Sequence, residues 1–329
     1  MSRIKFHSLA SQFCLVCLYM LIPVSLFFVG ISSSDRFSPF PDTTVSIIPI
    51  ATSVSITQPV ASGVAVDSGD GFDLDFSNID QGYFMARYFG NENYCMLSVV
   101  NDEGVYYNYR MYPGDDWLAA PFSCGEGTYN VLLCEPLVVD GVESLAQIFS
   151  KLYKVVLIDE MSPYLIPNHY IQYDENSLVV QTAAAIAASS SSRAETVESI
   201  YEFVSDSISF DEDRLTYVQE NFVPMSAPDV DQILCEHKGI CWDSAIVLVV
   251  MLRSQGIPAQ LACGDYSGEF HAWAYVYVGD VSGTDLKPDQ EGWVLLDPTY
   301  GASFTGSIPS LIRASSPVSS NAYALEYQF

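Results

Sequence analysis

Basic residues are scarce in this 329-residue sequence: 13 Lys and Arg stand against 40 Asp and Glu, which leaves a net charge of −27. A surface this acidic repels phosphate backbones, so the sequence argues against nucleic-acid binding. A solvated acidic exterior is the simplest explanation for the charge, and it would favour cationic partners. Hydrophobic residues make up 49% of the chain, which is enough for a folded core and too much for an intrinsically disordered protein.

Metal-binding signatures are also scarce. The chain has four histidines and no recognisable calcium-binding loop. Its one Cys-x-x-Cys pair, Cys14 and Cys17, lies inside an apolar run. The stretch from Cys235 to Cys241 places His237 between two cysteines, but a Cys-x-His spacing is too tight for common zinc sites. We therefore expect no metal site and no cofactor.

A single apolar run, residues 13–31, is long enough to cross a bilayer. Arg3 and Lys5 precede it and three serines follow it, which is the layout of an export signal. We expect residues 1–34 to be a signal peptide or a membrane anchor, and residues 35–71, rich in Ser, Thr and Pro, to be a linker. The folded body would then be extracellular, secreted or anchored, with membrane contact only through the N-terminal segment.

The folded body is expected to have two parts, and its predicted fold class is α+β. Between residues 72 and 160, short runs rich in Tyr, Val and Leu alternate with turn signals such as GNEN and PGDD, a pattern typical of a small all-β, sandwich-like domain. Residues 161–175 contain two prolines and would form a junction. Residues 176–304 show helical periodicity and then strands, and the tail at 305–329 ends in YALEYQF, which predicts an edge strand.

Local signals divide this second part into helices and strands. The Ala-rich stretch 176–189 predicts one helix, and Ser192 with Glu195 forms the S-x-x-E pattern of a capping box before a second, amphipathic helix. The β-branched residues of 242–254 predict a buried helix. Strands are predicted at 259–265, 271–278 and 293–297.

Cys241 stands at the start of the predicted buried helix. The first backbone N–H groups of a helix have no partner within it, and the helix dipole is positive there. Both effects favour a thiolate, the form a nucleophile needs, and the same N–H groups could hold an oxyanion. A buried structural cysteine is the competing interpretation, since cysteine is among the most buried residue types.

His271 opens one predicted strand and Asp297 ends the next. Antiparallel pairing of these strands would bring the two residues together, so that Asp297 could orient the imidazole. The register we choose places His271 opposite Asp297 and Tyr275 opposite Trp293. A shift of two residues would still leave the pair within reach.

Together these stretches, KGICWDSAIVLVVMLRSQGIPA, HAWAYVYV and GWVLLDPTY, resemble the transglutaminase-like superfamily, and most closely its bacterial exported branch. The resemblance covers residues 195–302. It implies a papain-like core in which Cys241 is the nucleophile, His271 the base and Asp297 the residue that orients it. The β unit is similar to a domain that often precedes this core.

Some residues depart from the family pattern or have no assigned place in it. Trp242 follows the nucleophile where Phe, Tyr or small residues are frequent. Papain-like enzymes place an extra oxyanion donor before the nucleophile, and no residue here is its clear equivalent. Gln219 and Asn221 are the candidates for this donor. We expect Asp243 in a loop or helix turn near the mouth of the site.

Six cysteines lie outside the apolar run, at positions 95, 124, 134, 235, 241 and 263. If Cys241 stays a thiol, an odd number remains, so at least one more is free or pairs between chains. A Cys235–Cys263 disulfide beside the active helix is one alternative, and the connectivity stays open.

The expected activity is acyl transfer by an exported thiol enzyme that acts on peptide or protein amides at the cell surface. Water as acceptor gives a peptidase or amidase, and a lysine amine gives a protein-glutamine transamidase; the sequence does not choose between them. The alternative is a non-catalytic cell-surface binding module on a transglutaminase-like scaffold. The oligomeric state stays open.

Overall fold

The computed structural model describes residues 55–139, 141–221, 223–266, 268–279, 286, 288–289, 291–299 and 323–329. All of them belong to one compact unit, Ile50–Phe329. The predicted signal or anchor at 1–34 lies outside the described residues, as does the first part of the predicted linker. Within the described ranges, no helix is both long enough and apolar enough to cross a membrane.

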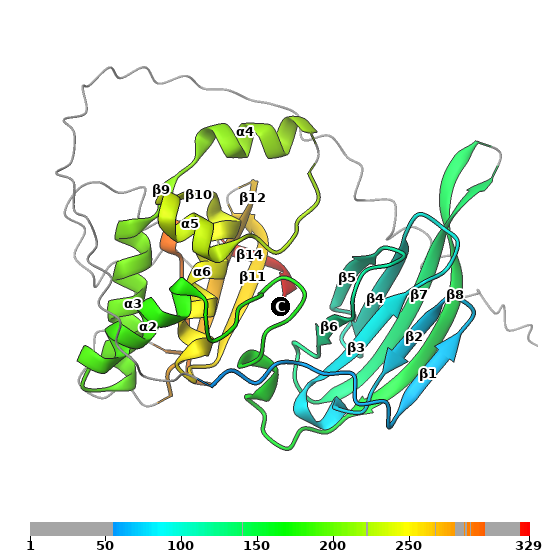
Figure 1. The fold of residues 1–329 in the computed structure, drawn as a ribbon, viewed down its shortest axis with the longest axis horizontal. Coiled ribbons are helices and arrows are strands. Elements are labelled where there is room, and N and C mark those ends of the chain that lie inside the picture. The colour runs from blue at the N-terminus through cyan, green and yellow to red at the C-terminus, as the bar shows by residue number, and fades with distance from the viewer. Residues whose placement is uncertain are drawn as a thin grey trace, which may run out of the picture. The chain divides into compact units, whose positions relative to one another are not determined.

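The N-terminal part of this unit consists of two four-stranded antiparallel sheets (Figure 1). The first has the order β1-β2-β3-β6, with β1 (Val66–Gly69), β2 (Phe72–Asp75), β3 (Tyr83–Tyr88) and β6 (Leu118–Pro121). The second has the order β5-β4-β7-β8, with β4 (Cys95–Asn101), β5 (Tyr106–Met111), β7 (Gly127–Val139) and β8 (Val142–Val155). Two short 3-10 helices, η2 (Ile79–Gln81) and η3 (Ser162–Tyr164), lie in the connections.

Aromatic rings join the two sheets. Phe76, directly after β2, stacks on Tyr153 of β8 with the ring centres 3.7 Å apart, and Phe84 of β3 stacks on Phe76 at 4.7 Å. Phe72 of β2 meets Phe149 of β8 edge-on at 5.3 Å. Because side chains alternate along a strand, each sheet contributes one face to this shared core. The sandwich-like arrangement predicted from the sequence is therefore present.

The hairpin of β7 and β8 is longer than the sequence led us to expect. The two strands run for 13 and 14 residues and are paired as far as Val139 and Val142, beyond the other strands of the sheet (Figure 1). Val138 and Val142 are 67% and 60% exposed, so the outer part of the hairpin has no core behind it. An Asp-Gly pair at 140–141 of the sequence is the turn signal that was overlooked.

The C-terminal part has a four-stranded antiparallel sheet and a group of helices. The sheet has the order β13-β12-β11-β14, with β11 (Ala259–Tyr266), β12 (Glu269–Tyr277), β13 (Trp293–Leu296) and β14 (Tyr323–Gln328). The helices are α2 (Leu178–Ser189), α3 (Arg193–Ser207), α4 (Glu212–Asn221), α5 (Val230–Glu236) and α6 (Cys241–Ser254). A short parallel pair, β9 (Ser209–Phe210) and β10 (Lys238–Gly239), precedes α4 and α6. This mixture of helices and antiparallel sheet confirms the predicted α+β class.

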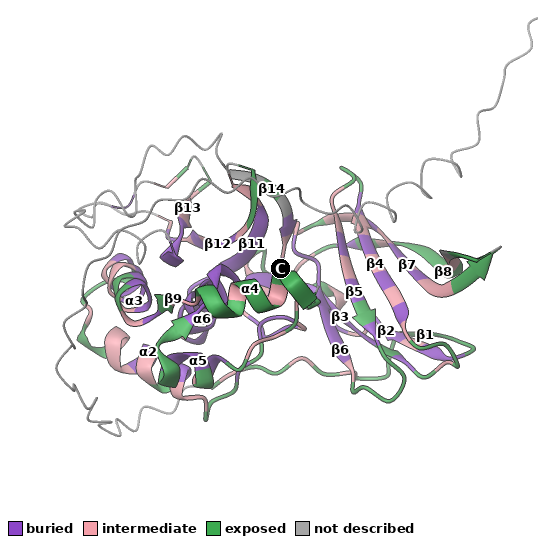
Figure 2. Cartoon of the chain, turned by 90° about the horizontal axis from the view of Figure 1, so that it is seen from above, coloured by how far each residue is buried: buried purple, intermediate pink, exposed green. Residues whose placement is uncertain are grey.

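Helix α6 is the centre of this part. All of its residues are buried, and it packs on β11 and β12 as well as on α2, α3 and α5 (Figures 1 and 2). Near its end, the buried Arg253 guanidinium donates to the carbonyls of Ile166 (2.6 Å), Ala259 (2.8 Å) and Phe329 (3.0 Å). Burial lowers the pKa of Arg253 to about 10. The cost of burying this cation is offset by the three hydrogen bonds, which tie three segments to α6.

Two helix starts show how the sequence sets the helix ends. Ser192 caps α3 by accepting a hydrogen bond from the N–H of Glu195 (3.1 Å), as the S-x-x-E pattern predicted. The Glu195 carboxylate, however, accepts from the N–H of Ser191 (2.6 Å), so the return bond of the capping box goes to the residue before the cap. Helix α2 is capped from outside, because Asp231 of α5 accepts from the N–H groups of Leu178 and Val179.

The register between β12 and β13 differs from the one we chose. Tyr277, rather than Tyr275, pairs with Trp293, so β13 is displaced by two residues along β12. Tyr277 and Trp293 also touch through their rings, with centres 5.5 Å apart. The displacement aligns the position of Asp297 with Trp273, two residues from His271 along the strand, on the same side of the sheet.

Candidate active site

Cys241 is the first residue of α6, directly after the N-cap residue Ile240. Cys241 is buried, with only 8% of its surface exposed. The first hydrogen bond inside the helix runs from the N–H of Ser244 to the carbonyl of Ile240. The N–H groups of the first turn therefore have no carbonyl partner in the helix, and they concentrate positive potential at the sulfur.

His271 and Asp297 meet as predicted. His271 lies near the start of β12, and its Nε2 donates to Oδ2 of Asp297, directly after β13, at 2.7 Å. Both side chains are largely buried. The hydroxyl of Tyr201 on α3 donates to the backbone carbonyl of Asp297 (3.0 Å), which fixes the turn that carries the carboxylate. Sequence reasoning had no signal for Tyr201 beyond its place on the apolar face of its helix.

The pKa of His271 connects the imidazole to both neighbours. Burial lowers this pKa, but hydrogen bonds from the ring to Asp297 and Cys241, and the charges of these groups, outweigh burial and raise it to about 10. Since Nε2 is engaged by Asp297, Nδ1 is the ring nitrogen left for the sulfur. An imidazole protonated at neutral pH beside a cysteine is the arrangement of an ion-paired thiol.

Aromatic residues lie around the His271 imidazole and the start of α6. The ring of Tyr266 on β11 lies 5.5 Å from the ring of His271. Gly264, which pairs with His271 across the sheet, has no side chain to place against the imidazole. Trp242 donates its indole N–H to the carbonyl of Ser226 (2.9 Å) and meets the ring of Tyr170 edge-on at 5.5 Å. Trp242, the residue after Cys241, thus holds the segment between α4 and α5 against the start of α6.

The sequence led us to expect Asp243 near the mouth of the site, and the structure places it elsewhere. Its side chain is fully buried at the third position of α6, where Oδ2 accepts from the N–H of Ile240 (3.0 Å). Arg214 of α4 pairs with the same carboxylate. The three-residue spacing from the N-cap is the signal that could have identified this capping role.

The two predicted oxyanion donors are not set up for that role. Gln219 and Asn221 are both exposed on α4, and the Asn221 amide donates to the carbonyl of Tyr217 on its own helix (2.8 Å). The backbone N–H groups at the start of α6 are the donors that the geometry offers at Cys241.

The remaining candidate residues are Cys235, Cys263 and His237. Cys235 is exposed on α5, whereas Cys263 is buried in β11, and the structure does not join them, so the Cys235–Cys263 alternative is wrong. His237 ends α5 in the left-handed conformation (φ 54°), and its Nδ1 pairs with the carbonyl of Ser207 at 3.0 Å.

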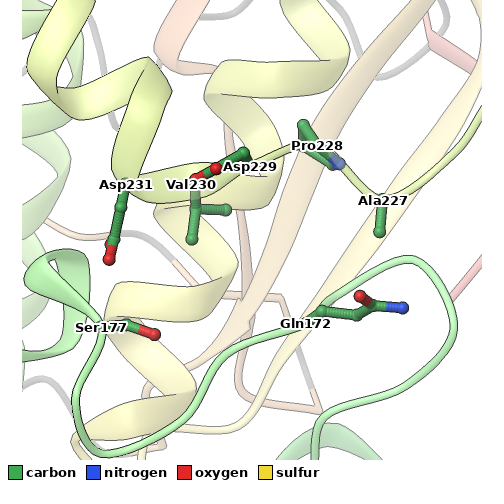
Figure 3. Close-up of a pocket in the computed structure, with 7 residues that line it drawn as sticks. All are labelled: Gln172, Ser177, Ala227, Pro228, Asp229, Val230 and Asp231. Atoms are coloured by element: carbon green, nitrogen blue, oxygen red, sulfur yellow. The ribbon is translucent and has the colours of Figure 1, made fainter.

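A polar pocket opens beside the start of α5 (Figure 3). It is lined by Gln172, Ser177, Ala227, Pro228, Asp229, Val230 and Asp231. Its two acids already cap helices: Asp229 accepts from the N–H of Gln232 in α5 (3.0 Å), and Asp231 caps α2. None of the three predicted catalytic residues lines this pocket.

Comparison with known proteins gives the class of the C-terminal part. Residues 180–298 match the family model described as the transglutaminase-like superfamily. This match confirms, for this segment, the resemblance seen in the sequence.

Individual relatives are more distant. An uncharacterised protein of Bacillus subtilis (strain 168), YebA, is 37% identical over an alignment that covers 28% of this chain and only 14% of YebA. Among solved structures, a candidate cysteine protease from Cytophaga hutchinsonii has a TM-score of 0.38 at 14% identity, and covers 72% of this chain and 77% of its own. Red sea bream transglutaminase has a TM-score of 0.27 at 12% identity, with coverages of 66% and 48%.

Proposed function

We propose that this protein is an exported thiol acyl-transfer enzyme that acts on peptide or protein amides through Cys241, His271 and Asp297. The observation that carries the proposal is the position of the His271 ring. It is hydrogen-bonded to the Asp297 carboxylate at 2.7 Å on one side and to Cys241, at the start of α6, on the other. The transglutaminase-like core of residues 180–298 supports the same chemistry.

The mechanism follows from the charges of the three groups. The Cys241 thiolate attacks the amide carbonyl, and the N–H groups of the first turn of α6 stabilise the oxyanion that forms. Imidazolium His271 gives its proton to the leaving amine as the C–N bond breaks, which leaves a thioester on the sulfur. Neutral His271 then takes a proton from the incoming water or amine, and the thioester collapses to product and thiolate. Asp297 holds the ring and stabilises its cationic form throughout.

The place of action is part of the proposal. Arg3 and Lys5 ahead of the apolar run at 13–31 support export or anchoring, so the substrate would be a peptide or protein at the cell surface. The acidic composition of the chain favours cationic substrates over anionic ones.

Competitive alkylation tests the proposal, because the chain contains its own reference thiol. Cys235 is exposed on α5, whereas Cys241 is buried. With limiting iodoacetamide at pH 6, peptide mapping should show faster labelling of Cys241 than of Cys235, although accessibility alone predicts the reverse. His271→Asn should remove this advantage, and His237→Asn, at a histidine bonded to Ser207, is the matched control that should keep it.

Labelling of Cys235 ahead of Cys241 in the folded wild type would count against the enzyme. The protein would then be better described as a non-catalytic surface module on the same scaffold.

A further inference from the structure

The carboxylate of Asp243 is the charged group built into the start of the nucleophile helix. It has no exposed surface, and its Oδ2 accepts from the N–H of Ile240, the residue directly before Cys241, at 3.0 Å. The Arg214 guanidinium contacts both oxygens of the Asp243 carboxylate. Its Nε lies 2.8 Å from Oδ2, and its Nη2 lies 2.9 Å from Oδ1.

The backbone is shaped around this carboxylate. A Cβ on Gly239 would lie 2.9 Å from the Cβ of Asp243 and 3.4 Å from its Oδ2, closer than side chains tolerate. The glycine two residues before the nucleophile is therefore required by Asp243, in addition to any role in the approach to the sulfur.

Asp243 creates an electrostatic conflict with the proposed chemistry. A carboxylate stabilises the start of a helix, but a negative charge two residues from Cys241 opposes a thiolate and the oxyanion that follows it. Burial raises the pKa of Asp243, and the N–H of Ile240 and the Arg214 guanidinium counter that rise. The pKa of Asp243 therefore stays above its ordinary value, and the two contacts of Arg214 offset the negative charge of the carboxylate.

Other charges near this pair do not replace Arg214. Asp211, at the approach to α4, is acidic and accepts from the N–H of Arg214 (3.0 Å), and its charge acts against ionisation of Asp243. Lys238 of β10 pairs with Asp211 at 3.7 Å. Helix α4 has no buried residue, so Arg214 reaches Asp243 from a surface helix.

We propose that Arg214 is a positioning residue that acts on the Cys241 thiolate through Asp243, by neutralising the carboxylate that caps the nucleophile helix. The inference rests on the proposed function, because it presumes an active thiolate. Its consequence is that the positive charge of one residue on a surface helix, Arg214, sets the reactivity of the buried Cys241 sulfur.

The test is the rate of iodoacetamide alkylation at Cys241 between pH 5 and 9 in four variants, with Cys235 as internal reference. Arg214→Gln should move the midpoint of the profile upward by about one pH unit, which corresponds to roughly tenfold slower alkylation at pH values below the wild-type midpoint. Arg214→Lys keeps the positive charge but loses the bidentate contact, so its rate should lie between those of wild type and Arg214→Gln. Asp243→Asn keeps an oxygen for the Ile240 N–H but removes the charge, so it should not slow alkylation, and Arg214→Gln/Asp243→Asn should recover the rate lost in Arg214→Gln.

If Arg214 and Asp243 had only a structural role, the variants would change the alkylation rate in a different pattern. Slow alkylation in both single variants, with no recovery in the double variant, would overturn the inference, as would an unchanged profile in Arg214→Gln. Near-ultraviolet circular dichroism checks that each variant folds. If Asp243→Asn does not fold, the comparison of Arg214→Lys with Arg214→Gln is sufficient, and equal alkylation rates in these two variants would overturn the inference. Wild-type Cys241 that reacts no faster than Cys235 would instead defeat the proposed function itself.

Discussion

Replacing His271 by asparagine should remove the thiolate of Cys241 at pH 6. In the wild type, Asp297 and Cys241 raise the pKa of His271 to about 10 against the effect of burial. The difference from an ordinary histidine value of about 6.5 corresponds to roughly 5 kcal/mol in favour of the imidazolium, at 1.4 kcal/mol for each factor of ten. In the proposed enzyme, this stabilisation would draw the proton from the sulfur to the ring.

The expected size of the change follows from the thiol equilibrium. An ordinary cysteine thiol, with a pKa of about 8.5, is only about 0.3% ionised at pH 6. Thiolate absorbance at 240 nm and pH 6 should therefore fall to almost none in His271→Asn. Cys95 contributes nothing at this pH, because burial raises its pKa to about 12.

Cys241→Ser supplies the baseline for this titration. A wild-type thiolate signal at pH 6 no larger than that of Cys241→Ser would refute the reasoning, since the ion pair would then be absent. A signal that survives in His271→Asn would also refute it, because the helix start alone would then account for the thiolate.

Three further predictions follow from the same contacts. The folded pKa of His271 lies above its unfolded value, so the stabilisation it provides is complete below about pH 6.5 and is lost as pH rises through about 10; urea unfolding should show the gap between wild type and His271→Asn shrinking over that range. Asp297→Asn should slow reaction with a peptide thiol-acylating reagent by about 10²-fold or more while the near-ultraviolet spectrum stays unchanged; an unchanged rate would remove Asp297 from the site. Arg253→Leu removes three hydrogen bonds to buried carbonyls, of which that of Phe329 keeps another donor, the N–H of Leu261. It should lower the unfolding free energy by about 3 kcal/mol or more; a loss below about 1 kcal/mol would show that these bonds contribute little.

The parts of the structure that follow local rules were predictable. A run of β-branched residues with a cysteine at its start gave a buried helix, and the capping box gave the start of α3 at Ser192. The meeting of His271 with Asp297 followed from antiparallel pairing of consecutive strands. It survived a wrong register because a displacement of two residues keeps side chains on the same face of the sheet.

The parts that depend on distant contacts were not predictable. Asp243 is polar and lies early in a helix, which is typical of an exposed turn. Its ion pair with Arg214 joins residues 29 positions apart, and no local pattern indicates it. The oxyanion candidates on α4 failed for a related reason, because nothing in the sequence of Asn221 shows that its amide is bound by its own helix. The long β7–β8 hairpin was missed because its outer half has no core to impose alternating burial.

The most direct test of the account is a nuclear magnetic resonance titration of the His271 ring nitrogens, assigned by comparison with His271→Asn among the four histidines of the chain. The account predicts an imidazolium that persists above neutral pH and titrates near 10. A ring that loses its proton near 6.5 would mean that neither the carboxylate nor the sulfur holds it.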